Sequence, residues 1–536
     1  MCGQTVTITT PNPPRTIRRA VGESGPTVWT RLFGIDLRSL AAMRIGLAVL
    51  LLVDLIDRGG DLTAHYTDFG TMPRSLVADR VADSPWSLSL HMISGTAPIE
   101  AVLFIAAGVC ALALLVGWYT RLFNILSWFL LMSLHNRNPM ILQGGDVLLR
   151  MMLFFGMFLP LGAQWSIDSV WRAGPGARGI CFSAATVALL LQIAFMYWFS
   201  VFLKTDPSWW RDFTAVYYAL SLTHFVRPAG LLLLPYGGFL KALTISTLLV
   251  EGLGPVAAFA SGLLRWPART AVVLSFILFH AGMGLCLELG LFSLICSVAW
   301  LPFLPGGFWD WLQAKWPYRS RSSQVRNIFG PLLDLPGKTS PLLTYNLNPT
   351  RLNHVCAAFF IAYVFLWNLR SINHDRFVRF LPHRFDFVAW LSGTCQVGDM
   401  FSPCPLREVG WFVMPAQLAD GEEVDLFRQG APVSWEKPPL ISAMYKNDRW
   451  RKYMVVLAAA SSTDRRLPYA QWLARTWNET HPPDRQILTF QIFLMLQTTV
   501  PDYKTAPAKP LMLWTHDCRP EPTPEQDTSD TDLDQD

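Results

Sequence analysis

The stretch YWFSVFLKTDPSWW, from Tyr197 to Trp210, ends a long apolar run that begins at residue 180. A helix needs roughly 20 mainly apolar residues to cross a bilayer, because about 30 Å must be spanned at 1.5 Å per residue. The run 180–203 has that length and stops at Lys204, with Asp206 and a tryptophan pair close behind. The stretch therefore predicts a membrane-spanning helix whose C-terminal end is polar.

Similar apolar runs recur through the first two thirds of the chain. The 536 residues are 51% hydrophobic and only 15% charged, whereas about a quarter of a soluble globular chain is charged. Besides 180–203, the predicted spans are 36–57, 99–119, 121–135, 146–163, 229–260, 269–286, 288–304 and 352–370. The sequence thus predicts an all-α polytopic membrane helical bundle of about nine spans with a small C-terminal α+β domain.

The segments outside these spans differ from them in composition. Residues 1–30 are polar, contain prolines and lack the apolar core of a cleavable signal peptide. A basic linker rich in proline and serine covers 311–351, so the transmembrane domain is expected over 31–372. Residues 373–518 have the composition of a soluble domain, and the acidic tail 519–536 has that of a disordered segment.

Basic residues are concentrated in the N-terminal segment and in alternate loops. The clusters are Arg15, Arg18, Arg19 and Arg31; Arg121; Arg172 and Arg178; Arg265 and Arg269; and Lys315, Arg319, Arg321 and Arg326. Because positive loops stay in the cytoplasm, the N-terminus is predicted cytoplasmic and the 373–518 domain extracytoplasmic. The net charge of +5 mostly reflects these loops, so it indicates a lipid bilayer as partner and gives no support to nucleic-acid binding.

The C-terminal domain shows strand and helix patterns of its own. The segment 411–427 alternates around an Ala-Asp-Gly turn and predicts a β-hairpin, while 485–500 predicts a long strand. An amphipathic pattern predicts a helix over 469–481. The tryptophans of this domain are expected in its core rather than in a ligand site: Trp450, Trp472 and Trp477.

The nine cysteines do not form a disulfide framework. Five lie in apolar spans, where a small buried side chain is the expected role. Cys395, Cys404 and Cys518 would face the oxidising side, which favours one disulfide, and Cys395 with Cys404 is the preferred pair because they are close in sequence. No cysteine or histidine spacing typical of a metal site occurs, so no metal is predicted.

Lys204 supports two interpretations. In the first, it is an interfacial residue that extends its ammonium group to the headgroup layer beside the tryptophans. In the second, apolar surroundings keep its amine neutral, so that it can accept a proton. Asp206 argues partly against the second, since a nearby carboxylate favours the charged form. The residues alone leave both open.

Other polar residues lie where burial is costly. His280 falls within a predicted span with Glu288 eight residues later, and Glu251 lies beside a Gly/Pro break. A histidine in such a place can bind a ligand or simply a backbone carbonyl. The segment LHNRNPMILQGGD gathers side chains that suit either a wet loop or a cavity mouth: His135, Asn136, Arg137, Asn138, Gln143 and Asp146.

Four motifs in order resemble one family. They are LRSLAAMRIGLAVLLLVDLIDR with DLTAHYTDFGTMPR, HNRNPMILQGGD with FFGMFLPLGAQWSID, LKTDPSWW, and FHAGMGLCLELGLFS with WLPFLP. Over about residues 30–310 the chain resembles the horizontally transferred transmembrane domain of vitamin K-dependent γ-carboxylases and their bacterial relatives. The resemblance implies a bacterial inner-membrane protein with a cytoplasmic N-terminus and an outer C-terminal region.

The resemblance also implies a chemistry. Lys204, Asp206 and Trp209 match the K-x-D-x-x-W spacing around the lysine proposed as the base that activates a reduced quinone. In that reaction the hydroquinone consumes O2 and becomes a strong base, which deprotonates a peptide glutamate that then adds CO2. His280, with Gly290 and Phe292, matches the Phe-His and Gly-x-Phe element.

Two departures separate the chain from the pattern. Around the polar Asn-His element the alignment falls on Asn136, Arg137 and Asn138, with His135 displaced. After His280 the polar side chains of the family are replaced by the apolar run 281–285. The expected partners are therefore the bilayer and a peptide or protein substrate, but a non-catalytic transporter, a lipid- or peptide-binding protein and an exported-peptide maturation factor remain alternatives.

Overall fold

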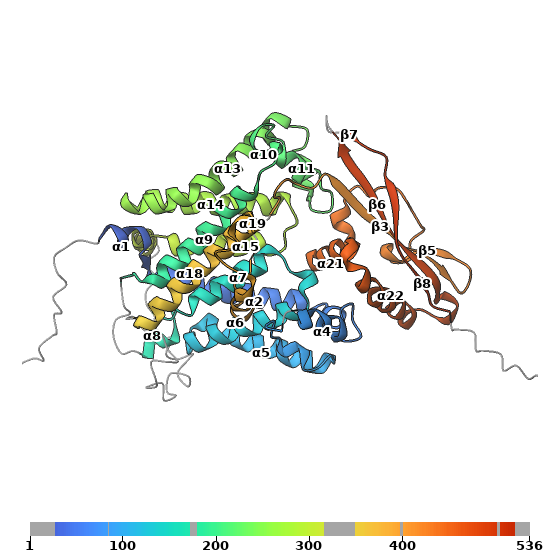
Figure 1. The fold of residues 1–536 in the computed structure, drawn as a ribbon, viewed down its shortest axis with the longest axis horizontal. Coiled ribbons are helices and arrows are strands. Elements are labelled where there is room, and N and C mark those ends of the chain that lie inside the picture. The colour runs from blue at the N-terminus through green and yellow to red at the C-terminus, as the bar shows by residue number, and fades with distance from the viewer. Residues whose placement is uncertain are drawn as a thin grey trace, which may run out of the picture.

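The computed structural model describes residues 27–83, 85–171, 179–315, 349–396, 400–500 and 504–519. A helical body formed by the first two thirds of the chain is followed by a smaller domain built on an antiparallel sheet (Figure 1). The predicted division into a helical bundle and a C-terminal α+β domain is confirmed. The segment 1–26, most of the linker 311–351 and the tail from 520 lie outside the described residues.

Six helices of the described chain are long and apolar enough to cross a membrane. They are α2 (Leu37–Gly59), α5 (Ala97–Val116), α9 (Ala184–Leu203), α13 (Gly237–Ala260, continued by a 3₁₀ turn to Leu263), α14 (Trp266–Cys286) and α18 (Arg351–Ile372). A seventh span is formed if the bent pair Phe292–Phe303 and Gly306–Lys315 counts as one. The described residues therefore give six or seven candidate spans rather than about nine.

The difference arises in three predicted spans that form shorter or more polar helices. They are α6 (Thr120–Arg137), α7 (Gly144–Gly156) and α15 (Phe292–Ala299). With 13 residues α7 is about 20 Å long, and α15 has only 8 residues. Helix α6 is continuous, but buried polar residues interrupt its apolar sequence, among them Asn124, His135 and Arg137. Helices α6 and α7 are therefore not candidate spans by length and composition, whereas α15 belongs to the bent pair that can form the seventh.

The bundle is organised around α9 and α2. Helix α9 packs against α18, α13 and α7, whereas α2 packs against α5 and α15. A capping box starts α9, because Ser183 and Thr186 each accept a hydrogen bond from the other's backbone N–H. Lys204 is the C-cap of α9, and Asp206 then caps the short helix α10 (Pro207–Trp210). The chain therefore turns sharply at Lys204.

The C-terminal sheet has β6 (Ile487–Val500) at its centre. One edge of β6 pairs with β3 (Glu408–Val413) and β4 (Pro415–Leu418), and the other with β8 (Lys509–Asp517). The hairpin partner of β4 is β5 (Glu423–Asp425), and β7 (Lys504–Thr505) pairs with the end of β6. The predicted hairpin and long strand are confirmed.

Two helices link this sheet to the bundle. They are α21 (Asp448–Ala458) and α22 (Arg466–Thr480), and the second confirms the predicted amphipathic helix. Trp477 is buried, and Trp450 stacks on Trp472 with 5.0 Å between ring centroids. All three pack in one hydrophobic cluster, so their predicted core role is confirmed. Helix α21 faces the bundle and α22 lies beside it (Figure 1).

The predicted pairing of Cys395 with Cys404 is wrong, because both are free thiols, as is Cys518. Cys395 lies against Arg150, whose Nη2 donates to its carbonyl oxygen at 3.2 Å. Cys404 instead lies in the wall of a cavity beside α9. Closeness in sequence did not bring the two thiols together.

Candidate functional site

Lys204 forms a buried ion pair. Its Nζ donates to Glu251 Oε2 on α13 at 2.6 Å and to Ser200 Oγ one turn earlier on α9 at 2.6 Å. The ammonium group also lies 4.9 Å from the centre of the Trp209 ring, a cation–π distance. Only 2% of the lysine side chain is exposed. The interpretation of Lys204 as a residue reaching into the headgroup layer is therefore wrong.

Asp206 does not pair with Lys204, although only one residue separates them. Its Oδ1 accepts a hydrogen bond from the backbone N–H of Ser208 at 2.8 Å, and Arg407 lies 3.9 Å away. An aspartate before proline is a favourable N-cap, which explains this conformation. The carboxylate that accompanies Lys204 is Glu251, which the sequence had marked separately as a buried acid.

A cavity of about 370 Å³ adjoins this ion pair. Ser200 and Glu251 lie in its wall, while Lys204 stands behind them. Most of the wall is apolar or aromatic and comes from α7, α9, α14 and the segments that hold Leu222, Phe225, Leu289 and Phe292. Helices α13 and α18 contribute Glu251 and Asn368, and α21 and the segment 400–406 complete the wall. Its polar residues are Gln143, Gln192, Ser200, Glu251, His280, Asn368, Gln396, Ser402, Arg451 and Lys452.

His280 belongs to the same wall and ends a hydrogen-bond chain. Trp300 Nε1 donates to the Tyr197 hydroxyl oxygen at 2.8 Å, and that hydroxyl lies 2.7 Å from His280 Nε2. Because an indole N–H can only donate, the tyrosine hydrogen is left for Nε2, which assigns the ring proton of a neutral His280 to Nδ1. Nδ1 has no partner among the described residues, so the site contains one unused donor.

Gln192 supplies an unused acceptor in the same wall. Its Nε2 donates to Gln396 Oε1 at 2.8 Å, and its own Oε1 has no partner among the residues described. Neither Gln192 nor Ser200 was among the site residues expected from the sequence. Both are polar residues inside the apolar run 180–203, and Ser200 lies four positions before Lys204, so a search for polar residues on one face of that helix would have found them.

The other predicted binding residues lie elsewhere. Arg137 is fully buried and donates to the carbonyl oxygens of Met72 and Tyr66 at 2.7 and 2.9 Å. Asn138 donates to a carbonyl of the same loop at 3.0 Å, and Asn136 to another at 2.8 Å. These three residues fasten the loop that follows α2, and none lines the cavity. The structure brings together Lys204, Trp209 and, across the cavity, His280, but not the Asn136–Asn138 segment.

A second cavity of about 320 Å³ lies between the bundle and α21. Its wall is mainly polar and shares Gln143 and Arg451 with the first cavity. Gln143 Nε2 donates to Asp448 at this boundary, and Arg451 pairs with the same carboxylate. The two cavities therefore adjoin where the bundle meets the outer domain.

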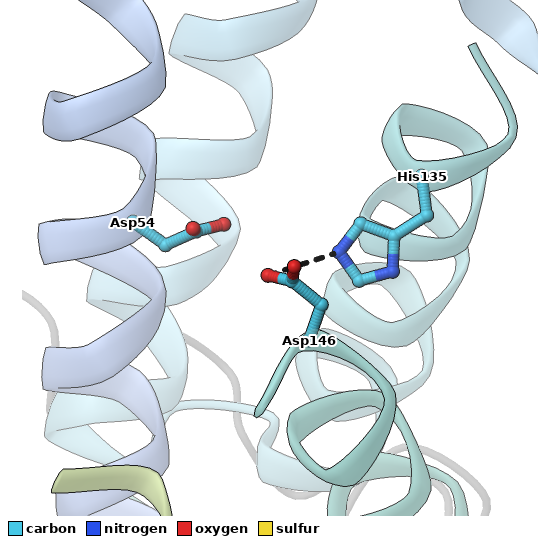
Figure 2. A group of neighbouring side chains, drawn as sticks. All are labelled: Asp54, His135 and Asp146. Atoms are coloured by element: carbon cyan, nitrogen blue, oxygen red, sulfur yellow. Dashed lines mark ion pairs between the residues drawn. The ribbon is translucent and has the colours of Figure 1, made fainter. Parts of the chain in front are cut away.

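A second buried ionic cluster joins the outer domain to the bundle. Asp54 on α2 and Asp146 on α7 face each other with His135 beside them (Figure 2). Arg449 from α21 enters between them, with Nη2 2.6 Å from Asp54 Oδ1 and Nη1 2.6 Å from Asp146 Oδ2. Arg58 donates to the remaining carboxylate oxygens at 2.8 Å.

This cluster does not fit a metal ion, although Asp54, His135 and Asp146 lie close enough to share one. Every carboxylate oxygen already accepts a hydrogen bond from a guanidinium group, and two positive charges balance two negative ones. A divalent cation would add uncompensated charge beside Arg58 and Arg449. His135 Nε2 lies 3.9 Å from Asp146, which is too long for a hydrogen bond.

No protein-family profile, no characterised protein and no solved structure matches this chain in the comparisons made with it. The resemblance to γ-carboxylases therefore remains a prediction from the four motifs.

Proposed function

We infer that the chain is a multi-pass membrane enzyme that couples oxidation of a reduced quinone to deprotonation and carboxylation of a peptide glutamate or a related substrate. The observation that carries this proposal is the buried Lys204–Glu251 pair beside a mainly apolar cavity. A bacterial inner membrane, a cytoplasmic N-terminus and an extracytoplasmic C-terminal domain complete the proposal.

The bundle surface supports insertion in a bilayer. Large apolar side chains are highly exposed on three of the long helices: Ile105 on α5 at 66%, Leu253 on α13 at 62% and Leu278 on α14 at 70%. Such wide apolar faces are unfavourable in water and mark a membrane or protein contact. Together with the six long helices, they favour a lipid surround for the bundle.

The cavity suits a flat aromatic ligand with oxygen substituents. Its volume lies in the usual range for small-molecule sites, roughly 300–1,000 Å³, and aromatic residues such as Phe199, Phe279 and Phe292 form much of its wall. Glu251 in this wall has one carboxylate oxygen that can accept a hydrogen bond from a ring hydroxyl. A bound hydroquinone would supply reducing equivalents for O2 and, once oxidised, a strong base. An apolar wall would protect that base from water.

A peptide substrate would approach through the second cavity. Its charged wall between the bundle and α21 suits a polar main chain, and the Gln143–Asp448 contact lies where it adjoins the first cavity. Opening that contact would connect the outer domain with the ion pair. This arrangement supports a substrate on the extracytoplasmic side.

The test is product formation. Purified protein in lipid nanodiscs receives reduced vitamin K, O2, bicarbonate and a glutamate peptide, and mass spectrometry measures quinone epoxide and carboxylated peptide. We expect both products from wild type and from Lys241→Ala, a lysine exposed on α13 that serves as the control, but not from Lys204→Ala. Absence of both products from folded wild type beside a working carboxylase would refute the proposal.

The fixed position of Lys204 also favours a second candidate, a non-catalytic transporter, a lipid- or peptide-binding protein or an exported-peptide maturation protein that shares the fold. A lysine bound by Glu251 and Ser200 is fixed in place, as in a static binding site. This candidate predicts that wild type binds a quinone or a lipid in the cavity without converting it.

A further inference from the structure

The two residues of the Lys204–Glu251 ion pair differ in their position relative to the cavity. Glu251 lies in the cavity wall with 12% of its side chain exposed, whereas Lys204 lies behind it with 2% exposed. Glu251 Oε2 accepts the hydrogen bond from Lys204, and Oε1 has no hydrogen-bond partner among the described residues. A ligand in the cavity therefore meets a carboxylate oxygen before it meets the ammonium group.

Lys204 is poorly placed to act as the base. Its Nζ lies 2.6 Å from each of two acceptors and faces the Trp209 ring, an environment that satisfies a positive charge. An ammonium group has three donors and no acceptor, so Lys204 could take a proton only after giving one away. Separating the charges in this buried site costs free energy, because attraction between opposite charges is strong where water is excluded.

We propose that Glu251 is the group that takes the proton from the ring hydroxyl of the reduced quinone, and that Lys204 is a positioning residue that stays protonated. In this step the ligand O–H bond breaks, a bond forms between that hydrogen and Glu251 Oε1, and the electron pair remains on the ligand oxygen. The proposal rests on the proposed function and changes the role that the K-x-D-x-x-W spacing assigns to Lys204.

The neighbouring groups fit this division of roles. Lys204, itself held by Ser200, donates to Glu251 Oε2 and leaves Oε1 of this cavity-wall residue free for a ligand. The positive charge also remains close to the oxyanion that forms on the ligand, which lowers its energy in an apolar site. His280 lies in the same cavity wall, and its unpaired Nδ1 donor is buried beneath the wall surface, so it can serve a second ligand oxygen only if the ring shifts.

Substitutions at Glu251 and Lys204 separate the two roles. The change at Glu251 is expected to lower the rate of quinone oxidation if Glu251 is the base, but to keep or raise it if Lys204 is the base. If Glu251 is the base, Glu251→Gln lowers quinone oxidation by 10²–10⁴-fold, the usual contribution of a general base. If Lys204 is the base, the same change frees its amine from the ion pair, so activity is kept or rises. Lys204→Arg keeps the cation but cannot accept a proton. We expect Lys204→Arg to retain at least a tenth of the wild-type rate of quinone oxidation. Lys204→Met, which lacks the cation, should retain a much smaller fraction.

A binding measurement supplies a readout independent of turnover. Quenching of tryptophan fluorescence compares 1-naphthol, which donates a ring hydroxyl, with 1-methoxynaphthalene, which cannot. We expect wild type to prefer 1-naphthol by at least tenfold, as for a hydrogen bond to a charged group. Lys204→Arg should keep this preference and Glu251→Gln should reduce it severalfold. Thermal unfolding verifies that each variant is folded.

Each outcome decides the inference. It is overturned if folded Glu251→Gln keeps more than a tenth of the oxidation rate, if Lys204→Arg is no more active than Lys204→Met, or if Glu251→Gln leaves the preference for 1-naphthol intact. Any of these results beside an active wild type refutes the role of Glu251 alone. A folded wild type that oxidises no quinone refutes the proposed function and this inference together.

Discussion

Two buried ionic clusters in this molecule differ in how completely their charges are satisfied. In the cluster of Asp54, Arg58, Asp146 and Arg449, every carboxylate oxygen accepts a hydrogen bond from a guanidinium group. In the Lys204–Glu251 pair, one carboxylate oxygen has no hydrogen-bond partner among the described residues, and a cavity adjoins it. The first cluster is closed and the second is open.

The difference separates a structural role from a chemical one. A closed cluster has no group left to offer a ligand, but it fixes the relative position of the elements that supply it. Here those elements are α2, α7 and α21, so the closed cluster holds the outer domain against the bundle. An open cluster keeps an acceptor for a ligand.

The largest expected effect is on the closed cluster. Arg449→Met removes the charge that bridges Asp54 and Asp146 and leaves two buried carboxylates with one guanidinium group. We expect the free energy of unfolding to fall by about 3–5 kcal/mol, as when one partner of a buried ion pair is lost. Thermal unfolding and limited proteolysis between bundle and outer domain measure the effect.

The matched control is Arg428→Met, which removes an exposed arginine of the same domain. Its unfolding should stay within about 0.5 kcal/mol of wild type. Equal stability of Arg449→Met and Arg428→Met would show that the closed cluster does not hold the two parts together.

A smaller effect is expected from acid at the same interface. Burial lowers the pKa of His65 to about 4, and its ring lies 4.4 Å from that of Trp450 on α21. Between pH 6.5 and 4 the unfolded chain therefore binds more protons at this residue than the folded chain, so stability falls as the pH is lowered. Full protonation of His65 would cost about 3 kcal/mol.

His65→Phe keeps an aromatic ring against Trp450 but cannot be protonated. Chemical unfolding at pH 7 and at pH 4.5 should show a smaller loss of stability for this variant than for wild type. An equal loss in both proteins would assign the acid sensitivity to other groups, such as carboxylates that lose their ion pairs.

The open site shows how far sequence could predict this arrangement. Lys204 and Glu251 were each identified because a charge in an apolar run costs free energy. Their pairing was not, because it depends on how α9 and α13 pack, with 47 positions between the two residues. Asp206 was expected beside Lys204 because it is close in sequence, but the helix that begins at Pro207 uses its carboxylate as a cap.

The closed cluster was harder to predict. Asp146 was noted only as one member of a polar segment, and nothing in the pattern of α21 distinguishes Arg449 from an exposed arginine of an amphipathic helix. The side chain of Arg449 reaches between α2 and α7 only because the whole outer domain docks on the bundle. The α+β character of that domain was predictable, because alternation and turn residues are local signals.

A third prediction concerns the hydrogen-bond chain in the open site. Tyr197→Phe removes the hydroxyl that lies between Trp300 Nε1 and His280 Nε2, so the imidazole is no longer held in one tautomer. We expect ligand affinity in the cavity to fall about tenfold, equivalent to about 1.4 kcal/mol. Titration of 1-naphthol by tryptophan fluorescence measures the loss.

Tyr218→Phe is the matched control, because Tyr218 does not line the cavity. It should leave the affinity for 1-naphthol unchanged. Unchanged affinity in Tyr197→Phe as well would mean that His280 does not contribute a hydrogen bond to the ligand.

The smallest effect is expected for Ser200→Ala, which removes one of the two acceptors of Lys204 while Glu251 stays in place. A hydrogen bond from a charged donor contributes about 1.5–3 kcal/mol. The adjoining cavity can admit a water molecule that replaces the hydroxyl. We therefore expect the free energy of unfolding to fall by about 1 kcal/mol or less. Thermal unfolding compared with Ser261→Ala measures it, because the buried Ser261 hydroxyl also donates to a helix carbonyl, that of Ala258, and neither residue lines the cavity. A loss as large as that of Arg449→Met would mean that the Lys204–Glu251 site is as closed as the other cluster, because only a site without access to water would leave the ammonium group unsatisfied.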